Sequence, residues 1–250
     1  MVSSLILAVR FLTVVPVPGG EVDPREALGR AAWWFPVVGL ALGVVLTAAD
    51  RALQAVVPPM LGAALVLAIW KVATGAIHLD GLADCLDGLA GHDRARRLAI
   101  MQDSRIGVFG AAALTFYLLI AFVGLGEMPT AARARILLVA PVVGRLAPLL
   151  IAPRFHLAKP DHGTGAAFLR GLSPWAGLVH LAAVAVLSAW LLGPLGPAML
   201  LASLLIVLLW TAFLSERFGG ITGDVLGSVI ELSELAMLLQ GASLARSGAI

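Results

Sequence analysis

The sequence has little charge. Only 13% of its 250 residues are Asp, Glu, Lys or Arg, whereas 60% are apolar. A typical soluble domain is about 45–50% apolar and about 25% charged, and the mean hydropathy here is +0.98. This composition excludes a disordered chain, a collagen-like repeat and almost any ordinary soluble enzyme. A helical protein that crosses the membrane several times is the class that remains.

Other features are scarce as well. The single cysteine, Cys85, allows no intramolecular disulfide and no cysteine-based zinc site. The net charge of +2 creates no basic field, so no nucleic-acid partner is expected. The apolar N-terminal segment contains Arg10 and no small-residue cleavage site, so we expect no signal peptide.

The apolar residues form runs of membrane-spanning length. Six firm runs cover residues 31–49, 56–77, 106–126, 136–153, 174–193 and 197–214, and a weaker seventh run covers 221–241. Segment 5–18 is too short to span and contains Pro16 and Pro18, so an interfacial or re-entrant helix is expected there. The sequence therefore predicts one all-α polytopic membrane domain over residues 1–250, with about six to seven transmembrane helices.

The basic residues predict how the spans are oriented. If the N-terminus is cytoplasmic and the firm spans alternate, ten arginines and lysines fall on one side, which the positive-inside rule assigns to the cytoplasm. Arg51, Arg133 and Arg135 fall on the other side, and the last two oppose this orientation. Lys71 and Arg145 lie inside predicted spans, where a buried charge needs a carboxylate partner. We expect a plasma (inner) membrane protein.

A first acidic cluster lies in residues 78–88, with the sequence HLDGLADCLDG. On a helix, Asp80, Asp84 and Asp87 fall within roughly a 60° arc of one face. Three such carboxylates repel one another, and a hard divalent cation such as Mg²⁺ would make the cluster favourable. A solvated helix end, or an aspartate that caps the next helix, is the alternative. His78 points to the opposite face and suits a structural role as well as substrate binding.

A second segment, 91–107, combines arginines with Asp103, Ser104 and Arg105. Guanidinium groups bind phosphate in a bidentate way, so the tight Asp-Ser-Arg-Ile-Gly turn is interpreted as functional. For Arg94, Arg96 and Arg97, contact with anionic lipid headgroups is the better interpretation.

A third segment begins with a glycine-rich turn. Such a turn, opening a helix, offers backbone N–H groups to an anion. Three carboxylates then follow within roughly an 80° arc and are expected to face the bundle interior, where they could meet the first cluster. The candidate substrate-binding and catalytic residues of this segment are Gly219, Gly220, Thr222, Gly223, Asp224, Glu231 and Glu234.

From the residues alone, the sequence indicates a membrane-embedded, Mg²⁺-dependent phosphotransferase with a cytoplasmic site. Segments 78–88, 103–110 and 219–227 closely resemble the cobalamin synthase family (cobalamin-5′-phosphate synthase, adenosylcobinamide-GDP ribazoletransferase). Arg10-Phe11-Leu12-Thr13 with Pro16 and Pro18, Trp34-Phe35-Pro36 and Gly144-Arg145 are also similar to that family. The resemblance runs essentially from end to end.

This resemblance implies the final step of cobalamin nucleotide-loop assembly. The family joins adenosylcobinamide-GDP to α-ribazole or its 5′-phosphate, releases GMP and requires Mg²⁺. Asp80, Asp84, Asp87 and Asp224 would then hold Mg²⁺ or accept a proton, while Arg105 and Arg145 would neutralise phosphate charge. Expected partners are these small molecules and membrane lipid, with a homo-oligomer and other cobalamin-biosynthesis enzymes as further candidates.

Three alternatives stay open. The Asp80-Gly81 pair also opens the motif of CDP-alcohol phosphotransferases, but Asp84-Cys85 stands where that motif has alanine and arginine. A membrane prenyltransferase also places two aspartate clusters over a magnesium diphosphate. A cation- or proton-coupled transporter would place carboxylates near the bilayer midplane and usually contains inverted repeats, and no repeat is visible here.

Overall fold

The computed structural model describes residues 2–19, 23–159 and 163–250, and within these ranges it contains helices and no strand. One isolated bridge joins Leu157 to Ile221. The α-helices are α1 (Val2–Leu12), α2 (Pro24–Ala31), α3 (Phe35–Gln54), α4 (Pro59–Ala73), α5 (Ile77–Gly88), α6 (Arg94–Ile100), α7 (Val108–Glu127), α8 (Thr130–Ile151), α9 (Thr164–Leu169), α10 (Ala176–Leu192), α11 (Leu195–Phe218) and α12 (Gly223–Arg246). Two 3₁₀ turns, Ala32–Trp34 and Ala152–Arg154, extend α3 and α8.

The predicted all-α polytopic class is confirmed. Among the described residues, five helices are long and apolar enough to cross a membrane, or six if the bent pair of α4 and α5 counts as one span. The weak seventh run is one of the five, because it forms the 24-residue helix α12. The run 174–193 forms α10, whose 17 residues make a shorter apolar helix.

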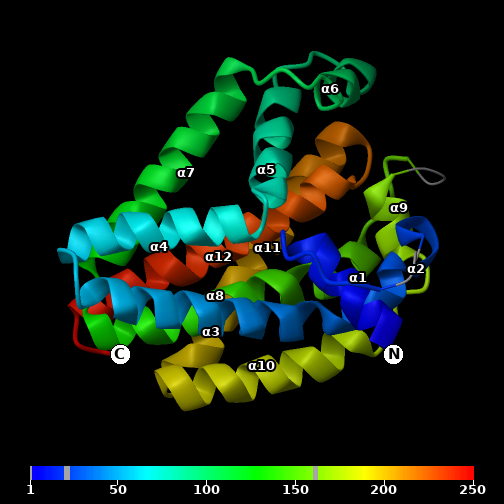
Figure 1. The fold of residues 1–250 in the computed structure, drawn as a ribbon. Helices are drawn as coiled ribbons and strands as arrows, with labels where there is room; N and C mark the ends of the chain where they lie inside the picture. Colours follow the sequence, from blue (N-terminus) through cyan, green and yellow to red (C-terminus); the bar gives the residue numbers. More distant parts are fainter. Residues whose placement is uncertain (1, 20–22, 160–162) are drawn as a thin grey trace.

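The predicted span 56–77 is broken. Helix α4 ends at Ala73, and α5 begins at Ile77 and turns away by 88°. Gly75 and Ala76 between them have positive φ angles of 61° and 54°, so the chain leaves the right-handed helix there. Figure 1 shows the consequence, with α5 standing upright on a layer of roughly parallel helices. The acidic motif is therefore carried by a separate helix.

Helix α8 lies at the centre of the bundle. It packs against α3, α10 and α12, and most of its side chains are buried. A Cβ on Gly39 or Gly43 of α3 would collide with the backbone of α8, so these two glycines, one helical turn apart, allow the close contact. Helix α8 therefore provides the surface on which the other long helices are arranged.

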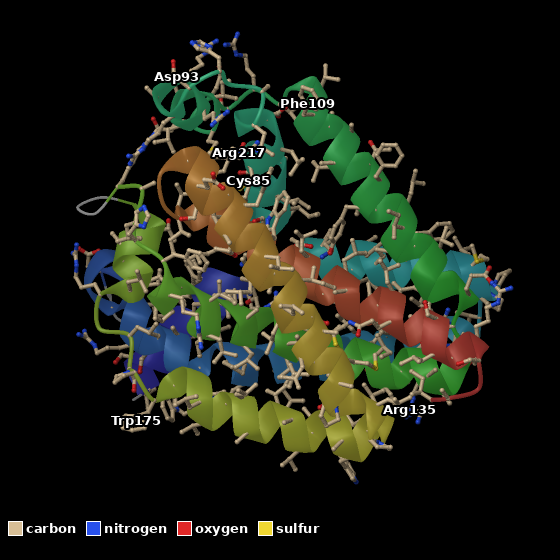
Figure 2. The ribbon with its side chains drawn as sticks, turned by 180° about the vertical axis from the view of Figure 1, so that it is seen from behind. Cys85, Asp93, Phe109, Arg135, Trp175 and Arg217 are labelled. Carbon is tan, nitrogen blue, oxygen red and sulfur yellow. The ribbon has the colours of Figure 1, made fainter. Side chains whose placement is uncertain are left out.

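One end of this bundle gathers segments that are distant in sequence. Figure 1 shows the start of α12 at the same end as the start of α3, with α9 and α2 beside them. Seen from behind in Figure 2, α11 crosses the bundle, and Arg217 in its last turn lies close to α5 and Cys85. Arg97 on α6 donates a hydrogen bond to the Arg217 carbonyl, with a distance of 3.0 Å. The three motif segments therefore meet at one end of the molecule.

Arg133, which opposed the predicted orientation, is not a loop charge. Its side chain is buried, and its Nε lies 3.1 Å from Oδ1 of Asp50 on α3. It also donates to the carbonyl of Leu125 at 3.3 Å. Because Arg133 forms a buried ion pair that ties α8 to α3, it carries little weight in counting exposed positive charge.

The N-terminal segment forms the predicted short helix. Helix α1 ends at Leu12 and buries Leu7, Ala8 and Leu12. Arg10 donates hydrogen bonds to the carbonyl oxygens of Val17 at 2.9 Å and Gly19 at 3.0 Å, so it holds the segment that follows the helix. Its placement at the membrane interface stays a prediction.

Candidate functional site

The site is built where α5 crosses α12. A Cβ on Gly81 would lie 2.8 Å from the carbonyl oxygen of Asp224, so only glycine lets the two backbones come this close. One helical turn away, a Cβ on Gly227 would lie 3.4 Å from the Cα of His78. The first and third motifs are therefore brought together by backbone packing, as the sequence predicts for Asp224.

Three carboxylates gather at this crossing. Asp80 is exposed, and Asp84 and Asp224 are partly buried. Asp84 lies close enough to Asp80, Asp224 and Asp87 for their negative charges to repel one another. Carboxylates of like charge held this close raise the free energy of the site unless a cation or protons offset them.

Asp87 differs from its neighbours. Its carboxylate is buried and accepts hydrogen bonds from the backbone N–H groups of Gly107 at 2.7 Å and Gly110 at 2.8 Å. These groups lie at the start of α7, so Asp87 caps that helix and favourably places its negative charge at the helix N-terminus. These contacts favour the capping alternative for Asp87 over the predicted metal ligation.

The donor set suits Mg²⁺ only together with a substrate. Within the described ranges, no group of three or more His, Cys, Asp or Glu side chains is arranged to hold a metal ion. Protein-bound Mg²⁺ commonly uses one or two carboxylates plus substrate phosphates and water. Asp80, Asp84 and Asp224 offer hard oxygen donors of this kind, and the metal requirement itself stays a prediction.

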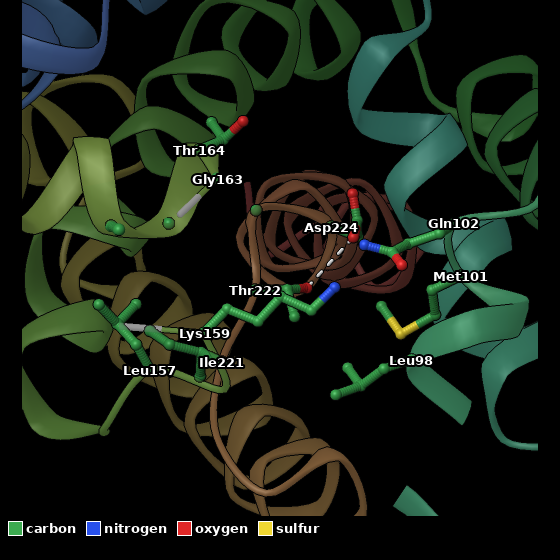
Figure 3. Close-up of a pocket in the computed structure, with 13 residues that line it drawn as sticks. Leu98, Met101, Gln102, Leu157, Lys159, Gly163, Thr164, Ile221, Thr222 and Asp224 are labelled. Carbon is green, nitrogen blue, oxygen red and sulfur yellow. Dashed lines mark hydrogen bonds between the residues drawn. The ribbon is translucent and has the colours of Figure 1, made fainter. Parts of the chain in front are cut away.

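Three cavities surround these carboxylates. One, of about 190 Å³, is shown in Figure 3, where the side chains of Lys159 and Gln102 extend toward Asp224 at the start of α12. A second, of about 170 Å³, contains Asp80, Asp224 and His78 in its wall. The third, of about 260 Å³, is lined by Asp80 and Asp84. The carboxylates thus lie between three separate cavities.

The Asp-Ser-Arg turn lines the third cavity. Asp103, Ser104 and Arg105 all belong to its wall. Arg105 donates to Asp103 through Nε at 2.9 Å and Nη2 at 2.6 Å, and this pairing lowers the pKa of Asp103 to about 2. Because the Arg105 side chain is 87% exposed, it remains accessible to a phosphate at the rim.

The glycine-rich turn is used mainly to hold the chain. Gly219 has a φ of 70° and caps α11, and Gly219 and Gly220 both donate their N–H groups to the Ser215 carbonyl. The Ile221 N–H donates to the backbone carbonyl of His156 at 2.9 Å. The Thr222 hydroxyl caps α12 by accepting a hydrogen bond from the Val225 N–H. Gly223 and Asp224, in the first turn of α12, are the residues after this turn that line two of the cavities.

Glu231 and Glu234 do not join the first acidic cluster. Both are buried deeper along α12, where Lys71 lies 2.6 Å from Glu231 and 3.2 Å from Glu234. Arg145 forms an ion pair with Glu234, and Lys71 also donates to the Tyr117 hydroxyl at 3.0 Å. The predicted need of Lys71 and Arg145 for carboxylate partners is confirmed. The two cations and two carboxylates form a buried neutral network, which favours a structural role for the glutamates and Arg145.

Two of the three arginines of α6, Arg94 and Arg97, donate hydrogen bonds to backbone carbonyls of the protein. Arg94 donates to the Ala158 carbonyl at 3.0 Å, and Arg97 donates to Gly91 at 2.9 Å as well as to Arg217. They tie α6 to the 156–158 loop and to the end of α11. This loop brings Lys159 to the site.

Sequence reasoning missed Gln102, Phe168 and Thr164 as site residues. Gln102 and Thr164 each line two of the three cavities. Phe168 comes from α9, a helix of six residues that no apolar run predicts. The bridge between Leu157 and Ile221 and the close approach of Thr164 to Gly223 bring this part of the chain to α12.

The fold and the site define an all-α polytopic membrane protein with an acidic site at one end of its bundle. The family model described as cobalamin-5-phosphate synthase matches residues 4–242, and the chain belongs to this family. An adenosylcobinamide-GDP ribazoletransferase of Pseudomonas paraeruginosa is 40% identical over 242 residues, covering 94% of this chain and 96% of the relative. One of Chlorobaculum tepidum is 37% identical over 252 residues, covering 97% and 96%. No solved structure gives a significant match.

Proposed function

We propose that this protein is an adenosylcobinamide-GDP ribazoletransferase. It joins adenosylcobinamide-GDP to α-ribazole, or to α-ribazole 5′-phosphate, and forms adenosylcobalamin or its 5′-phosphate with release of GMP. The names of relatives that are similar over almost the whole chain support this activity. The observation that carries the proposal is the contact between Gly81 and Asp224, which brings acidic residues of two family motifs to one place.

The reaction is a phosphoryl transfer between oxygens. A ribose hydroxyl of α-ribazole attacks the phosphorus on the cobinamide side of the diphosphate, and the bond from that phosphorus to the bridging oxygen breaks. GMP leaves with the bridging oxygen, and the hydroxyl proton passes to one of Asp80, Asp84 and Asp224. Arg105 at the cavity rim offsets phosphate charge.

One or two of Asp80, Asp84 and Asp224 would hold Mg²⁺ together with the substrate phosphates. The ion, when bound, neutralises charge on the diphosphate. Asp87 is assigned instead to position the start of α7, because both of its oxygens accept backbone hydrogen bonds. Lys159 and Gln102, which extend toward Asp224 in Figure 3, are proposed to contact the phosphates or the nucleotide.

We place the protein in the plasma (inner) membrane with the site facing the cytoplasm. The carboxylates lie at the same end as four basic residues, Arg94, Arg97, Lys159 and Arg217. The positive-inside rule assigns such an end to the cytoplasm. The 5′-phosphate preference, a homo-oligomer and contacts with other cobalamin-biosynthesis enzymes stay predictions.

The test is an assay of GMP release by membranes that contain the protein. Release should require both adenosylcobinamide-GDP and α-ribazole and should match formation of the joined corrinoid product. Consumption of an isoprenoid diphosphate or a CDP-alcohol instead would support one of the rival transferases. Substrate-driven cation uptake without GMP release would favour the transporter and refute the proposal.

A further inference from the structure

His78 is buried without a partner. Its side chain is 4% exposed, and neither ring nitrogen has a hydrogen-bond partner in the described part of the chain. A buried polar group that forms no hydrogen bond costs free energy, and most such groups in proteins are satisfied. His78 also lines the 170 Å³ cavity beside Asp80 and Asp224. The imidazole therefore has an unused hydrogen-bonding capacity at the wall of that cavity.

Three phenyl rings surround the same cavity. Phe11 comes from α1, Phe35 from α3 and Phe168 from α9. The rings of Phe11 and Phe35 are stacked with their centroids 5.8 Å apart, and Phe35 and Phe168 are also 5.8 Å apart. Aromatic walls of this kind favour a flat aromatic ligand, because ring contacts add stabilisation to the burial of apolar surface.

We infer that this cavity binds the benzimidazole base of α-ribazole and that His78 donates a hydrogen bond to the free ring nitrogen of that base. The inference rests on the proposed function and deepens it. One nitrogen of the base carries the ribose, so the base presents one acceptor and otherwise an apolar bicyclic surface. A neutral imidazole has the one N–H donor that this acceptor needs.

The other parts of the substrates fit this cavity less well. Guanine presents several donors and acceptors along its edge, and its donors would occupy the Asp80 and Asp224 carboxylates of this wall, which the proposed reaction needs for the ribose hydroxyl and the metal. A corrin ring is far larger than 170 Å³. With the base against the phenyl rings, the attached ribose extends toward Asp80 and Asp224, where its hydroxyl is required.

The test compares the two Michaelis constants of the GMP-release reaction in His78→Gln and His78→Phe. In His78→Phe the KM for α-ribazole should rise about tenfold because one hydrogen bond is lost, while the KM for adenosylcobinamide-GDP stays unchanged. His78→Gln keeps a donor and should recover part of the loss. His180→Gln is the matched control, because His180 is also buried but contacts Trp33 and Ala176 outside the cavity.

Phe168→Leu is the second variant if His78 variants do not fold, and it should also raise the KM for α-ribazole selectively. Equilibrium dialysis of α-ribazole with the purified wild-type and variant proteins checks binding without turnover. The inference would be overturned if only the KM for adenosylcobinamide-GDP rises. It would also be overturned if neither KM changes and α-ribazole binding is unchanged. If the wild-type protein releases no GMP with both substrates, the proposed function fails instead.

Discussion

Gly81 and Asp224 are in backbone contact: a Cβ on Gly81 would lie 2.8 Å from the Asp224 carbonyl oxygen and 3.0 Å from its Cα. This contact joins two motifs that are far apart in the sequence and on different helices. It positions the Asp80 and Asp84 carboxylates of α5 beside the first turn of α12. The separation of the two helices at this point therefore determines the geometry of the site.

Gly81→Ala should separate α5 from α12. We expect a loss of unfolding free energy of about 1–3 kcal/mol from overpacking and a loss of GMP release of about 100-fold, because small displacements of reacting groups are costly. Gly62→Ala is the control, since its Cβ would meet nothing closer than 3.8 Å. Rates and thermal unfolding in detergent test this, and a fully active Gly81→Ala protein would contradict the contact.

Asp84→Asn should lower GMP release by on the order of 100-fold and raise the Mg²⁺ concentration needed for half-maximal rate, because it removes a proposed metal ligand. Glu216→Gln removes an exposed carboxylate from the end of α11 and should change neither quantity. Titrating the rate with Mg²⁺ measures both effects. Normal Mg²⁺-dependent turnover by Asp84→Asn would refute the assignment of Asp84 as a ligand.

Asp87→Asn should act through folding rather than through metal binding. The loss of the charged cap at Gly107 and Gly110 should reduce stability by about 1–2 kcal/mol. The Mg²⁺ dependence of the remaining activity should match that of the wild-type protein. A shifted Mg²⁺ dependence with unchanged stability would instead identify Asp87 as a metal ligand.

The buried network should be strongly coupled. Arg145→Met leaves Glu234 without one of its two cations and should cost about 3–5 kcal/mol of unfolding free energy. Arg145→Met combined with Glu234→Leu should cost less than the sum of the single changes, because Lys71 and Glu231 still pair at 2.6 Å. Arg246→Met, at the exposed end of α12, is the control. Additive costs in denaturant unfolding would refute the coupling.

Much of the fold could be predicted because it depends on composition and run length. The apolar runs predicted an all-α membrane protein, and Lys71 and Arg145 predicted buried carboxylate partners. The break between α4 and α5 could not be predicted, because Gly75 and Ala76 lie within a continuous apolar run of the sequence. Their positive φ angles reflect tertiary packing that periodicity does not report.

The candidate site was predicted in part. Helix periodicity placed Asp224, Glu231 and Glu234 on one face, but it does not report depth, and the glutamates lie two to three turns further along α12. Helix capping was one alternative for the aspartates of α5, but periodicity could not identify Asp87 as the one that caps α7. Gln102, Thr164 and Phe168 reach the cavities through loop and short-helix placement, which has no periodic signal.

The central claim is that Asp84 on α5 and Asp224 on α12 act on the same substrate group. A double-mutant cycle on GMP release, with Asp84→Asn, Asp224→Asn and the combined variant, tests it most directly. Residues that act as a unit give strongly non-additive losses, so the combined variant should be no slower than the slower single variant. If the two fold-losses multiply in the combined variant, the two carboxylates act independently and the account is contradicted.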